Sequence, residues 1–523
     1  MQRYFNTTGF CRPEKHYMVN PTRGLLKEIY QLIENEQYFL IHAPRQSGKT
    51  TLLHSLCRQI NVEGKNIALT FSLENAGYKN IPVKEAMYLM VDTLYTAAKQ
   101  ILPKNELPPD IANYKEYAGL LFSYLTDWSQ QQTKPIVLFI DEIDSIWDEV
   151  LISTLRQLRN GFQYRPNGFP ASVALIGLRD IREYKTKVKE LDGEMGSGSP
   201  FNVKAESFFL KNFTKEQITQ LFQQYTEETG QQFSESVIDL IHIYTGGQPW
   251  LVNALANEIT VKILKNDYSK EITLEIVETA KENLIKRRDT HLDSLMDKLK
   301  ETRVKNIIQN IISGSRTESD SFNDDLQYCI DLGIVIETTE GLKITNKIYN
   351  EIIPRVLNLN FQESLKPIIS PDIFFKDGKL NLNFLLKEFQ KFYRRHFESW
   401  MQGFSYHEVG RQLLLMAFLQ RIINGGGKID REMAYGRGRT DLTIEFGGET
   451  FIIELKINYD SETRQDGLEQ LSGYLDKVGQ SKGYLMLFEP KSSKKVPWEQ
   501  RIKWEEIEFE WQAIKRQITI VEL

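Results

Sequence analysis

The chain has 523 residues, of which 41% are hydrophobic and 26% are charged, and its formal net charge is −5. A chain of this length and ordinary globular composition holds several domains, each able to bury a core of its own. The slightly acidic balance excludes a global basic field for nucleic acid, so any contact with nucleic acid must be local.

The cysteines and the lengths of the apolar runs indicate whether the protein is cytoplasmic, secreted or in a membrane. Three cysteines are scattered without metal-ligand spacing, which fits a reducing cytosol. No apolar run approaches the roughly 20 residues of a membrane span, and the N-terminal stretch MQRYFNTTGFCRPEKHY lacks the apolar core of a signal peptide. We therefore expect a cytoplasmic protein that makes no membrane contact.

A phosphate-binding loop is the first motif along the chain. An apolar strand, expected over 38–41, leads into APRQSGKTT and then into a helix expected over 49–60. This is the context that the motif requires, although Ala43 replaces its first glycine. Backbone N–H groups of such a loop cradle phosphate, Lys49 would reach the β- and γ-phosphates, and Thr50 would hold Mg²⁺. The predicted nucleotide-binding residues of this loop are Pro44, Arg45, Gln46, Ser47, Gly48, Lys49, Thr50 and Thr51.

The other half of an ATP site should be a buried strand that ends in acidic residues. The stretch KPIVLFIDEID supplies a continuous apolar run over 136–140, typical of a parallel strand covered on both faces. Asp141 would then hold Mg²⁺ through water, and Glu142 would orient the attacking water. We expect Asp144 to cap the helix that follows in SIWDEVLISTLRQLRNGF. Together the two motifs predict an ATP-binding domain.

Two later features are expected near the nucleotide. The stretch ASVALIGLRD reads as another central strand that ends at Arg179, which is either a γ-phosphate sensor or a strand-end surface charge. In YTGGQPW, Gly246 and Gly247 would end a helix and Pro249 would begin the next. This turn resembles the nucleotide-sensing turn in the helical lid of STAND and Orc-like ATPases. Upstream, Thr214 and Gln217 have the spacing of a capping box.

The middle of the chain predicts a helix followed by a small hairpin and another helix. We expect the first helix over 324–332, strands over 334–337 and 342–344, and a helix after them. This order resembles a winged helix, which either binds DNA or joins two domains. A role as a joint between domains is favoured over DNA binding, because the helix that would contact DNA carries three acidic residues, Asp324, Asp325 and Asp331.

A second hairpin lies near the C-terminus, in GRGRTDLTIEFGGETFIIELK. If Gly447 and Gly448 form its loop, Phe446 pairs with Glu449 and, five residues further out, Asp441 pairs with Glu454. The apolar side chains of both strands then share one face, whereas the charged side chains share the other. The apolar set is Leu442, Ile444, Phe451 and Ile453, and the charged set is Asp441, Glu454 and Lys456.

Two carboxylates side by side repel each other. An Mg²⁺ ion bound between them would remove this repulsion, because Mg²⁺ is positively charged and prefers oxygen ligands. Asp441 followed by Glu454-Leu455-Lys456 resembles the PD-(D/E)xK nuclease superfamily, although a surface hairpin with an ordinary ion pair has the same pattern. The resemblance implies that both carboxylates and the Leu455 carbonyl hold metal, and that Lys456 acts on a water. It also implies that Glu408 adds an acid on the metal side and that Gln470 contacts the site or the DNA. Otherwise, Glu408 is a first-turn helix acid and Gln470 a solvated helix residue.

Basic residues near this hairpin are candidates for phosphate contacts. Arg437 and Arg439 precede Asp441 and are the preferred candidates, unless they belong to a solvated loop. The helical stretch EFQKFYRRHFESW interleaves cations with aromatics, but aromatics at this spacing favour a core, as we expect for Phe389, Phe392, Phe397 and Trp400.

The whole chain resembles bacterial AAA-like ATPases of the STAND or archaeal type that are fused to a PD-(D/E)xK nuclease-like domain. The stretches that carry the likeness are HYMVNP, APRQSGKTT, FIDEID, TGGQPWLVN, DLGIV, NKIYNEIIPRVL, GRGRTDL and FIIELK. We accordingly expect an α/β multidomain protein with a parallel-sheet P-loop ATPase core at 1–204, a helical lid at 205–280, a winged-helix-like joint at 281–366 and a restriction-endonuclease-like α/β domain at 367–523.

The expected function is an ATP-regulated, Mg²⁺-dependent nuclease that cleaves phosphodiesters of nucleic acid, DNA in preference to RNA, and assembles as a homo-oligomer. ATP and Mg²⁺ are the expected cofactors. The resemblance also implies a role on mobile elements or in phage defence. The alternative is a nucleotide-dependent switch or scaffold whose C-terminal domain binds DNA or a partner without cutting.

Overall fold

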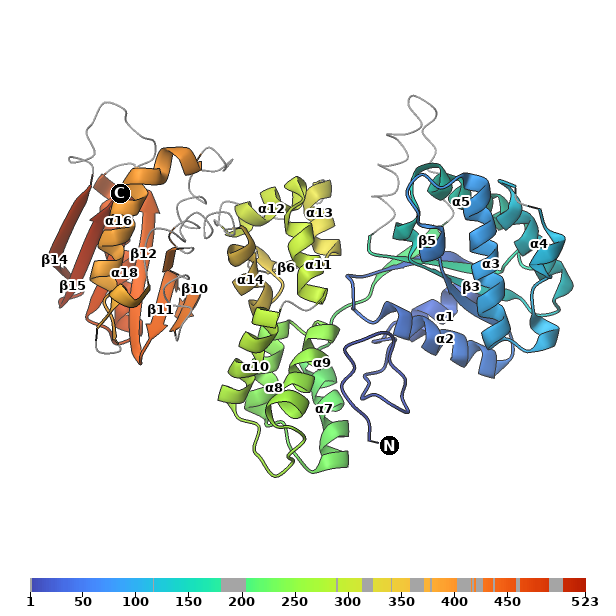
Figure 1. Ribbon diagram of the computed structural model, residues 1–523, viewed down its shortest axis with the longest axis horizontal. Coiled ribbons are helices and arrows are strands. Elements are labelled where there is room, and N and C mark those ends of the chain that lie inside the picture. Colours follow the sequence, from blue (N-terminus) through green and yellow to red (C-terminus); the bar gives the residue numbers. More distant parts are fainter. Residues whose placement is uncertain are drawn as a thin grey trace. The chain divides into compact units, whose positions relative to one another are not determined.

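The computed structural model of the chain describes residues 2–115, 117–179, 204–287, 290–312, 323–339, 341–357, 371–376, 379–401, 415, 418–419, 427–435, 438–457, 461–488 and 502–523. The chain forms two compact units. Figure 1 labels the helices and strands of both. The first comprises Met1–Lys300 with Glu318–Asn350, and the second comprises Glu301–Thr317 with Glu351–Leu523. No helix among the described residues is long and apolar enough to cross a membrane.

The first unit is built on a five-stranded sheet in which every paired strand runs parallel to its neighbour. The strand order is β2-β3-β4-β1-β5, with β1 at Tyr38–His42, β2 at Ile67–Ser72, β3 at Ile136–Asp141, β4 at Ser172–Gly177 and β5 at Lys204–Phe209. All residues of β1, β3 and β4 are buried, which explains their continuous apolar runs. The strands predicted before the P-loop, before Asp141 and before Arg179 are therefore confirmed.

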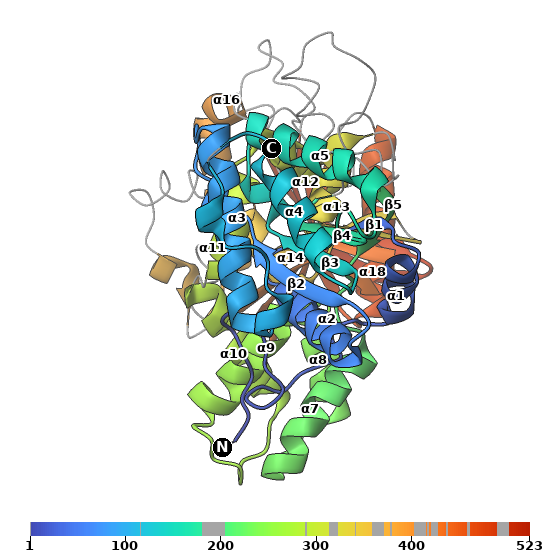
Figure 2. The same ribbon diagram turned by 90° about the vertical axis from the view of Figure 1, so that its right-hand side faces the viewer.

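Helices cover both faces of this sheet (Figures 1 and 2). One face packs against α1 (Leu26–Glu34) and α2 (Lys49–Glu63), and the other packs against α3 (Val83–Ile101), α4 (Leu120–Gln131) and α5 (Asp148–Gly161). Alternate residues of β1 divide between the two cores, since Leu40 joins the α3–α5 side and Phe39 and Ile41 join the α1–α2 side. This is the three-layer α/β architecture expected of a P-loop ATPase.

A group of helices follows the sheet in the sequence. It comprises α7 (Lys215–Thr229), α8 (Glu235–Thr245), α9 (Pro249–Asn257), a π-helical turn η6 (Glu258–Ile263) and α10 (Leu274–Arg287). The predicted capping box of α7 is confirmed, because the Thr214 hydroxyl accepts from the Gln217 amide and the Gln217 side chain accepts from the Thr214 amide. The predicted turn before α9 is also confirmed, with Gly246 and Gly247 in left-handed backbone and Pro249 at the first helical position.

The predicted helix–hairpin–helix of the middle region is confirmed as α13 (Asp324–Asp331), β6 (Val335–Thr338), β7 (Gly341–Ile344) and α14 (Lys347–Leu357). The two strands pair antiparallel, with Val335 opposite Ile344. Two helices precede this group, α11 (Thr290–Leu299) and α12 (Thr302–Ile312). Residues 358–370, which include the expected domain boundary at 366/367, lie outside the described residues.

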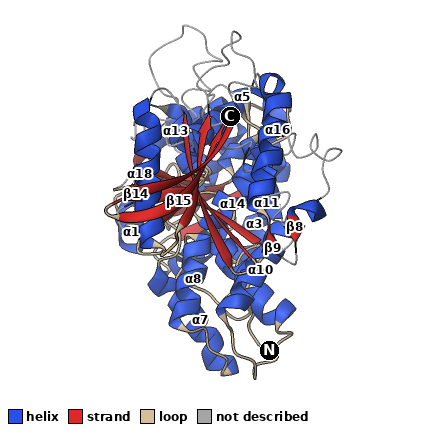
Figure 3. Cartoon of the chain, turned by 90° about the vertical axis from the view of Figure 1, so that its left-hand side faces the viewer, coloured by secondary structure: helices blue, strands red, loops and turns tan. Residues whose placement is uncertain are grey.

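The second unit contains a six-stranded mixed sheet of order β10-β11-β12-β13-β15-β14 (Figure 3). Its strands are β10 (Gly427–Tyr435), β11 (Gly438–Phe446), β12 (Glu449–Ile457), β13 (Lys482–Phe488), β14 (Lys503–Trp511) and β15 (Ile514–Glu522). The pairs β12–β13 and β13–β15 are parallel, whereas the other pairs are antiparallel. A short hairpin of β8 (Phe375–Lys376) and β9 (Lys379–Leu380) precedes the sheet.

Two helices cover opposite faces of the mixed sheet (Figure 3). Helix α16 (Leu382–Met401) buries Phe389 and Phe392 against one face, so the predicted core role of these two aromatics is confirmed. The side chains of Phe397 and Trp400 lie outside the described residues. Helix α18 (Ser461–Lys477) buries leucines against the other face.

The register of the C-terminal hairpin agrees with the sequence prediction. Phe446 pairs with Glu449 and Leu442 pairs with Ile453. Gly447 and Gly448 have φ values of 57° and 78°, which a two-residue turn of type I′ requires. Leu442, Ile444 and Ile453 are buried in the core on the α16 side, and Phe451 packs against them. The residues that alternate with Ile453, namely Ile452, Glu454 and Lys456, therefore face α18.

Candidate nucleotide site and candidate metal site

The P-loop lies between the end of β1 and the start of α2. Gly48 has a φ of 91°, and a Cβ atom at this position would lie 2.8 Å from Nη2 of Arg23. Glycine therefore suits this position in both its backbone conformation and the space available. The Ser47 hydroxyl donates to the Pro44 carbonyl at 2.7 Å, which closes the loop on itself.

The Lys49 ammonium is buried at the centre of the loop. Its Nζ donates to the carbonyls of Ala43 at 2.8 Å and Pro44 at 3.0 Å. Burial lowers the pKa of Lys49, and the carboxylates of Glu142 and Asp141 act in the opposite direction. A cation that is held by two carbonyls and has little solvent is prepared to bind an anion such as phosphate.

Thr50 and Asp141 meet at the start of α2. The Thr50 hydroxyl donates to Oδ2 of Asp141 at 3.1 Å, and the Glu142 amide donates to Oδ1 of the same carboxylate at 2.9 Å. Burial raises the pKa of both Asp141 and Glu142. A hydroxyl and a carboxylate are oxygen ligands of the kind that Mg²⁺ prefers, so these residues fit that ion.

Glu142 has left-handed backbone, with a φ of 57°. A residue with a side chain adopts this conformation at a cost of about 1–2 kcal/mol, which the surrounding structure must offset. The conformation turns the chain directly after Asp141 and leaves Glu142 at the wall of the cavity that contains the P-loop.

The prediction that Asp144 caps a helix is wrong. Asp144 lies in a short 3₁₀ turn, η4 (Ile143–Ser145), and α5 begins after Trp147, whose side chain makes no capping bond. The Asp144 carboxylate instead accepts a hydrogen bond from the Leu178 amide and lies 3.9 Å from the Arg179 guanidinium. It satisfies a backbone donor at the end of β4, a long-range partner that helix-cap spacing does not indicate.

Arg179 is largely buried rather than a solvated charge at a strand end, since its side chain is 14% exposed. It borders the same cavity as Lys49 and Glu142. Its guanidinium lies 4.7 Å from the centre of the Tyr328 ring, which is close enough for a cation–π contact. Arg179 therefore connects Asp144, which lies two residues after Glu142, with Tyr328 of helix α13.

The turn before α9 lies against the P-loop. The Gln248 amide group is 3.4 Å from the Gln46 carbonyl, and Pro249 borders the cavity. Gly247 allows the same turn to approach the segment before α7, because a Cβ atom there would lie 1.9 Å from the Phe213 carbonyl oxygen. The Phe213 amide donates to the Gly247 carbonyl at 2.8 Å, so the two backbones are in direct contact.

Sequence reasoning missed the part played by residues 2–24, which we term the N-terminal strap. The Cys11 amide donates to the Thr51 hydroxyl at 3.0 Å, and the Trp250 indole donates to the Thr7 carbonyl at 2.9 Å. The strap thereby bridges α2 and α9 and lines part of a cavity of about 720 Å³, a usual size for a ligand site. Cavity residues that the sequence analysis did not select include Met18, Val19, Arg23, Glu74, Trp147, Trp250, Ser294 and Lys298. The stretch HYMVNP overlaps the strap, but its residues carry no chemical signature that would have assigned them to a nucleotide site.

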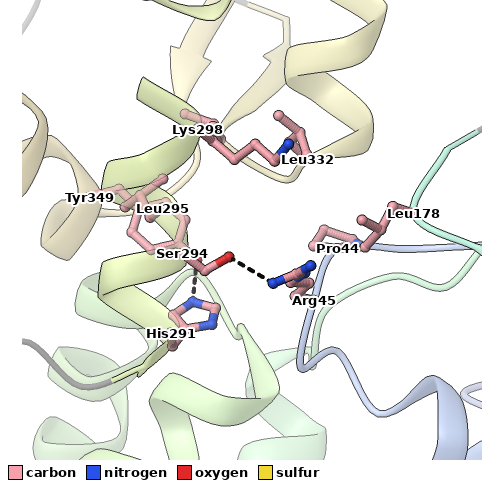
Figure 4. A pocket seen from close by; sticks show the side chains of 10 residues that line it. Pro44, Arg45, Leu178, His291, Ser294, Leu295, Lys298, Leu332 and Tyr349 are labelled. Carbon is pink, nitrogen blue, oxygen red and sulfur yellow. Dashed lines mark hydrogen bonds between the residues drawn. The ribbon is translucent and has the colours of Figure 1, made fainter. Parts of the chain in front are cut away.

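A smaller cavity of about 40 Å³ adjoins the P-loop on its α11 side (Figure 4). Nη1 of Arg45 lies 3.5 Å from the Ser294 hydroxyl, and Nδ1 of His291 lies 2.7 Å from Oε1 of Gln46. Two P-loop side chains thus contact successive turns of α11.

The C-terminal candidate residues form a chain of contacts between β12 and α18. Oε1 of Glu454 lies 3.2 Å from Nζ of Lys456, which donates to Oε1 of Gln470 at 2.7 Å. Glu454 is buried, with 3% of its side chain exposed, whereas the Lys456 side chain is 27% exposed. Gly467 permits the close approach of α18, because its Cβ would lie 3.3 Å from Cγ of Lys456.

Several predicted residues of this site lie outside the described part of the chain. Asp441 belongs to β11, directly before the paired Leu442, but its side chain is not described. Glu408 and Arg437 are wholly outside the described residues, as is the Arg439 side chain. Among the residues that are described, no three His, Cys, Asp or Glu side chains gather as a metal site.

The P-loop, Asp141 and Arg179 all fall within a single family match. The family described as "AAA-like domain" matches residues 23–353, which is more than half of the chain. The chain belongs to this AAA-like family. It is accordingly an ATP-binding P-loop ATPase over these residues, while the mixed sheet of the second unit lies beyond the match.

The comparison with solved structures includes matches to the following three proteins. The Walker-type ATPase of Pyrococcus abyssi is 13% identical, with 67% of this chain and 99% of that chain covered and a TM-score of 0.46. Thermotoga maritima RuvB, a Holliday junction branch migration motor, is 16% identical, with 64% and 95% covered and a TM-score of 0.34. Cdc6p from Pyrobaculum aerophilum is 14% identical, with 69% and 97% covered and a TM-score of 0.36. The comparison with curated proteins gives no match.

Proposed function

We propose that this AAA-like protein is an ATP-regulated, Mg²⁺-dependent nuclease that acts on DNA. The observation that carries the nuclease part is the contact chain Glu454–Lys456–Gln470, which joins a buried carboxylate to a partly exposed lysine. A carboxylate beside a lysine at a strand end can hold a metal and act on water, and either act supports phosphodiester hydrolysis.

In the ATPase part, the backbone N–H groups of residues 45–51 and the Lys49 ammonium would bind the phosphates of ATP. Thr50 and Asp141 would hold Mg²⁺, which supplies charge neutralisation on the phosphates. Glu142 would orient a water, and Arg179 would sense the terminal phosphate. The raised pKa of Glu142 suits a group that takes part in proton transfer, because its carboxylate is poorly solvated.

In the nuclease part, Asp441, Glu454 and the Leu455 carbonyl would hold Mg²⁺, with Glu408 as a further acid. The metal, when bound, supplies an activated water and stabilises the leaving oxygen. Lys456 would position that water, and Gln470 would orient Lys456 through the hydrogen bond at 2.7 Å. The hairpin register supports this set, since Asp441 lies one residue before Leu442, and Glu454 one residue after the Ile453 that pairs with Leu442.

The test is cleavage of supercoiled plasmid by the full chain in Mg²⁺, with and without ATP. Glu454→Gln should abolish cleavage and leave ATP binding unchanged, because the two sites use different residues. Glu449→Gln is the matched control, since Glu449 lies on the same strand and its side chain makes an exposed ion pair with Lys379. Cleavage that survives Glu454→Gln would refute the proposed metal site.

A second candidate function is a nucleotide-dependent switch whose C-terminal domain binds DNA or a partner without cutting it. The contacts of the P-loop with the winged-helix-like part favour it. Gly333 lies against Pro44, where a Cβ atom would approach Cγ to 2.5 Å, and His291 binds Gln46. Salt-dependent DNA binding in Mg²⁺ without any nicking would favour this second function over the first.

A further inference from the structure

Helix α11 presents one face to the P-loop. His291, Ser294, Leu295 and Lys298 border the small cavity beside Pro44 and Arg45, and their spacing places them on one side of the helix. Figure 4 shows the Lys298 side chain extending from α11 toward Leu332. Ser294 and Lys298 also border the large cavity that contains Lys49 and Thr50. The helix therefore reaches the nucleotide site itself.

Lys298 and Arg179 approach the same buried aromatic ring. Nζ of Lys298 lies 3.1 Å from the Tyr328 hydroxyl and 5.8 Å from the ring centre, while the Arg179 guanidinium lies 4.7 Å from that centre. Tyr328 is fully buried in α13. The ring thus holds a cation from the end of β4 and a cation from α11 close to each other.

Cations gathered at one place repel each other unless an anion joins them. The large cavity has five cationic side chains and three carboxylates among its described lining residues. The cationic residues are Arg23, Arg45, Lys49, Arg179 and Lys298, and the carboxylates are Glu74, Glu142 and Asp144. A polyphosphate is the anion that the P-loop takes, and its terminal group would extend toward the strand ends that carry Glu142 and Arg179.

We propose that Lys298 of α11 binds an oxygen of the terminal phosphate of ATP, within the same chain. Lys49 and Lys298 would then contact the phosphates from two sides, and the bound triphosphate would hold α11 against the P-loop. ADP is too short to make this contact. The inference depends on ATP binding by the AAA-like part and is independent of the proposed nuclease activity.

The first test compares ATP and ADP affinities of the full chain with Lys298→Met, by equilibrium titration with each nucleotide in Mg²⁺. A charge-assisted hydrogen bond predicts a loss of ATP affinity of about tenfold or more, with ADP affinity unchanged within about twofold. Lys298→Arg keeps the charge and should recover most of the loss. Lys300→Met is the control, because Lys300 is exposed and pairs with Asp297 at 2.8 Å. Equal effects on both nucleotides, or no effect on ATP, would overturn the proposal.

A second test uses the unmodified protein and does not depend on the stability of a variant. Lysines are labelled with an amine-reactive reagent in the presence of ADP or of a non-hydrolysable ATP analogue, and the labelled sites are measured by mass spectrometry. The proposal requires that the analogue protects Lys298 more strongly than ADP does, while Lys300 reacts equally in both. Equal protection of Lys298 by both nucleotides would contradict it. This outcome is separate from plasmid cleavage, so the two proposals can fail independently.

Discussion

The imidazole of His291 joins Gln46 of the P-loop to Tyr349 of α14. Nδ1 lies 2.7 Å from Oε1 of Gln46, and Nε2 lies 2.6 Å from the Tyr349 hydroxyl. Because the Gln46 oxygen can only accept, Nδ1 carries the proton and Nε2 accepts from the tyrosine. The Trp250 ring stacks on the same imidazole at 5.0 Å. One neutral histidine therefore contacts three separate elements of the first unit.

The environment of His291 predicts a pH dependence of stability. Burial lowers its pKa to about 4, whereas the unfolded chain should have the usual value of about 6.5. Between these values only the unfolded state binds the proton, so stability falls as the pH decreases from about 6.5 to about 4, by up to about 3 kcal/mol. Thermal unfolding of the wild type and of His291→Gln, from pH 4 to pH 8, measures this. An identical pH profile for the two proteins would show that His291 does not titrate in this way.

Lys49→Met should abolish ATP binding. The variant removes the ammonium that the carbonyls of Ala43 and Pro44 hold at the centre of the P-loop, and a hydrogen bond from a charged donor to phosphate is worth roughly 1.5–3 kcal/mol or more in a dry site. We expect at least about a hundredfold weaker binding of a fluorescent ATP analogue. Lys65→Met, a change at an exposed lysine in the same domain, should bind normally. Retained affinity in Lys49→Met would place the phosphates elsewhere.

Gly247→Ala should weaken both folding and ATP binding. Its φ of 70° is unfavourable for alanine, and the new Cβ would lie 1.9 Å from the Phe213 carbonyl, so the turn before α9 must move. Gly230→Ala is the matched control, because Gly230 has a φ of 76° but no atom within 4 Å of a Cβ. The control should lose only about 1–2 kcal/mol. Comparable unfolding temperatures for the two variants would show that the Phe213 contact is unimportant.

Gly467→Ala should reduce plasmid cleavage if Lys456 acts in the proposed site. The new Cβ would lie 2.8 Å from the Leu485 side chain and 3.3 Å from Lys456, which would displace the lysine from Glu454. Gly473→Ala, on the same helix, meets nothing closer than 3.6 Å and should stabilise α18 by about 0.5–1 kcal/mol. Initial cleavage rates of the two variants are compared at equal concentration. A Gly467→Ala enzyme as active as Gly473→Ala would exclude this positioning role.

Arg179→Gln should slow ATP hydrolysis more than it weakens ATP binding. Arg179 is held by Asp144 and by the Tyr328 ring at the wall of the cavity, where it would sense the charge on the terminal phosphate. We expect at least about a tenfold lower kcat with a change in affinity of only a few fold. Steady-state phosphate release and equilibrium ATP binding give the two quantities. A loss confined to affinity would make Arg179 a binding residue alone.

Local chemistry made much of this fold predictable. The P-loop between β1 and α2, the capping box of Thr214 and the Gly447-Gly448 hairpin each depend on neighbours within a few residues. Strand β3 is buried along its whole length, so its sequence is a continuous apolar run that is easily recognised. Its last residue is Asp141, as expected. In each case the residue pattern determines the backbone conformation, and tertiary contacts do not oppose it.

Long-range contacts were not predictable in the same way. Asp144 has the local pattern of a helix cap, yet it binds the Leu178 amide. The N-terminal strap reaches α9 through the bond between Thr7 and Trp250, residues 243 positions apart in sequence. The charged residues around Lys298 follow the pattern of an ordinary solvent-exposed helix. Only the packing of α11 on the P-loop brings Lys298 to the nucleotide cavity. Such partners have no sequence spacing that could reveal them.

The first unit is built from two stretches of chain, and this has a consequence for its synthesis on the ribosome. Asp331 lies 3.8 Å from His42 at the end of β1, and Gly333 lies against Pro44. At a translation rate of roughly 5–20 residues per second, these late partners emerge roughly 15–60 s after the P-loop itself. The nascent ATPase sheet therefore exposes this side of the P-loop during elongation, when chaperones and free nucleotide can reach it before α13 arrives.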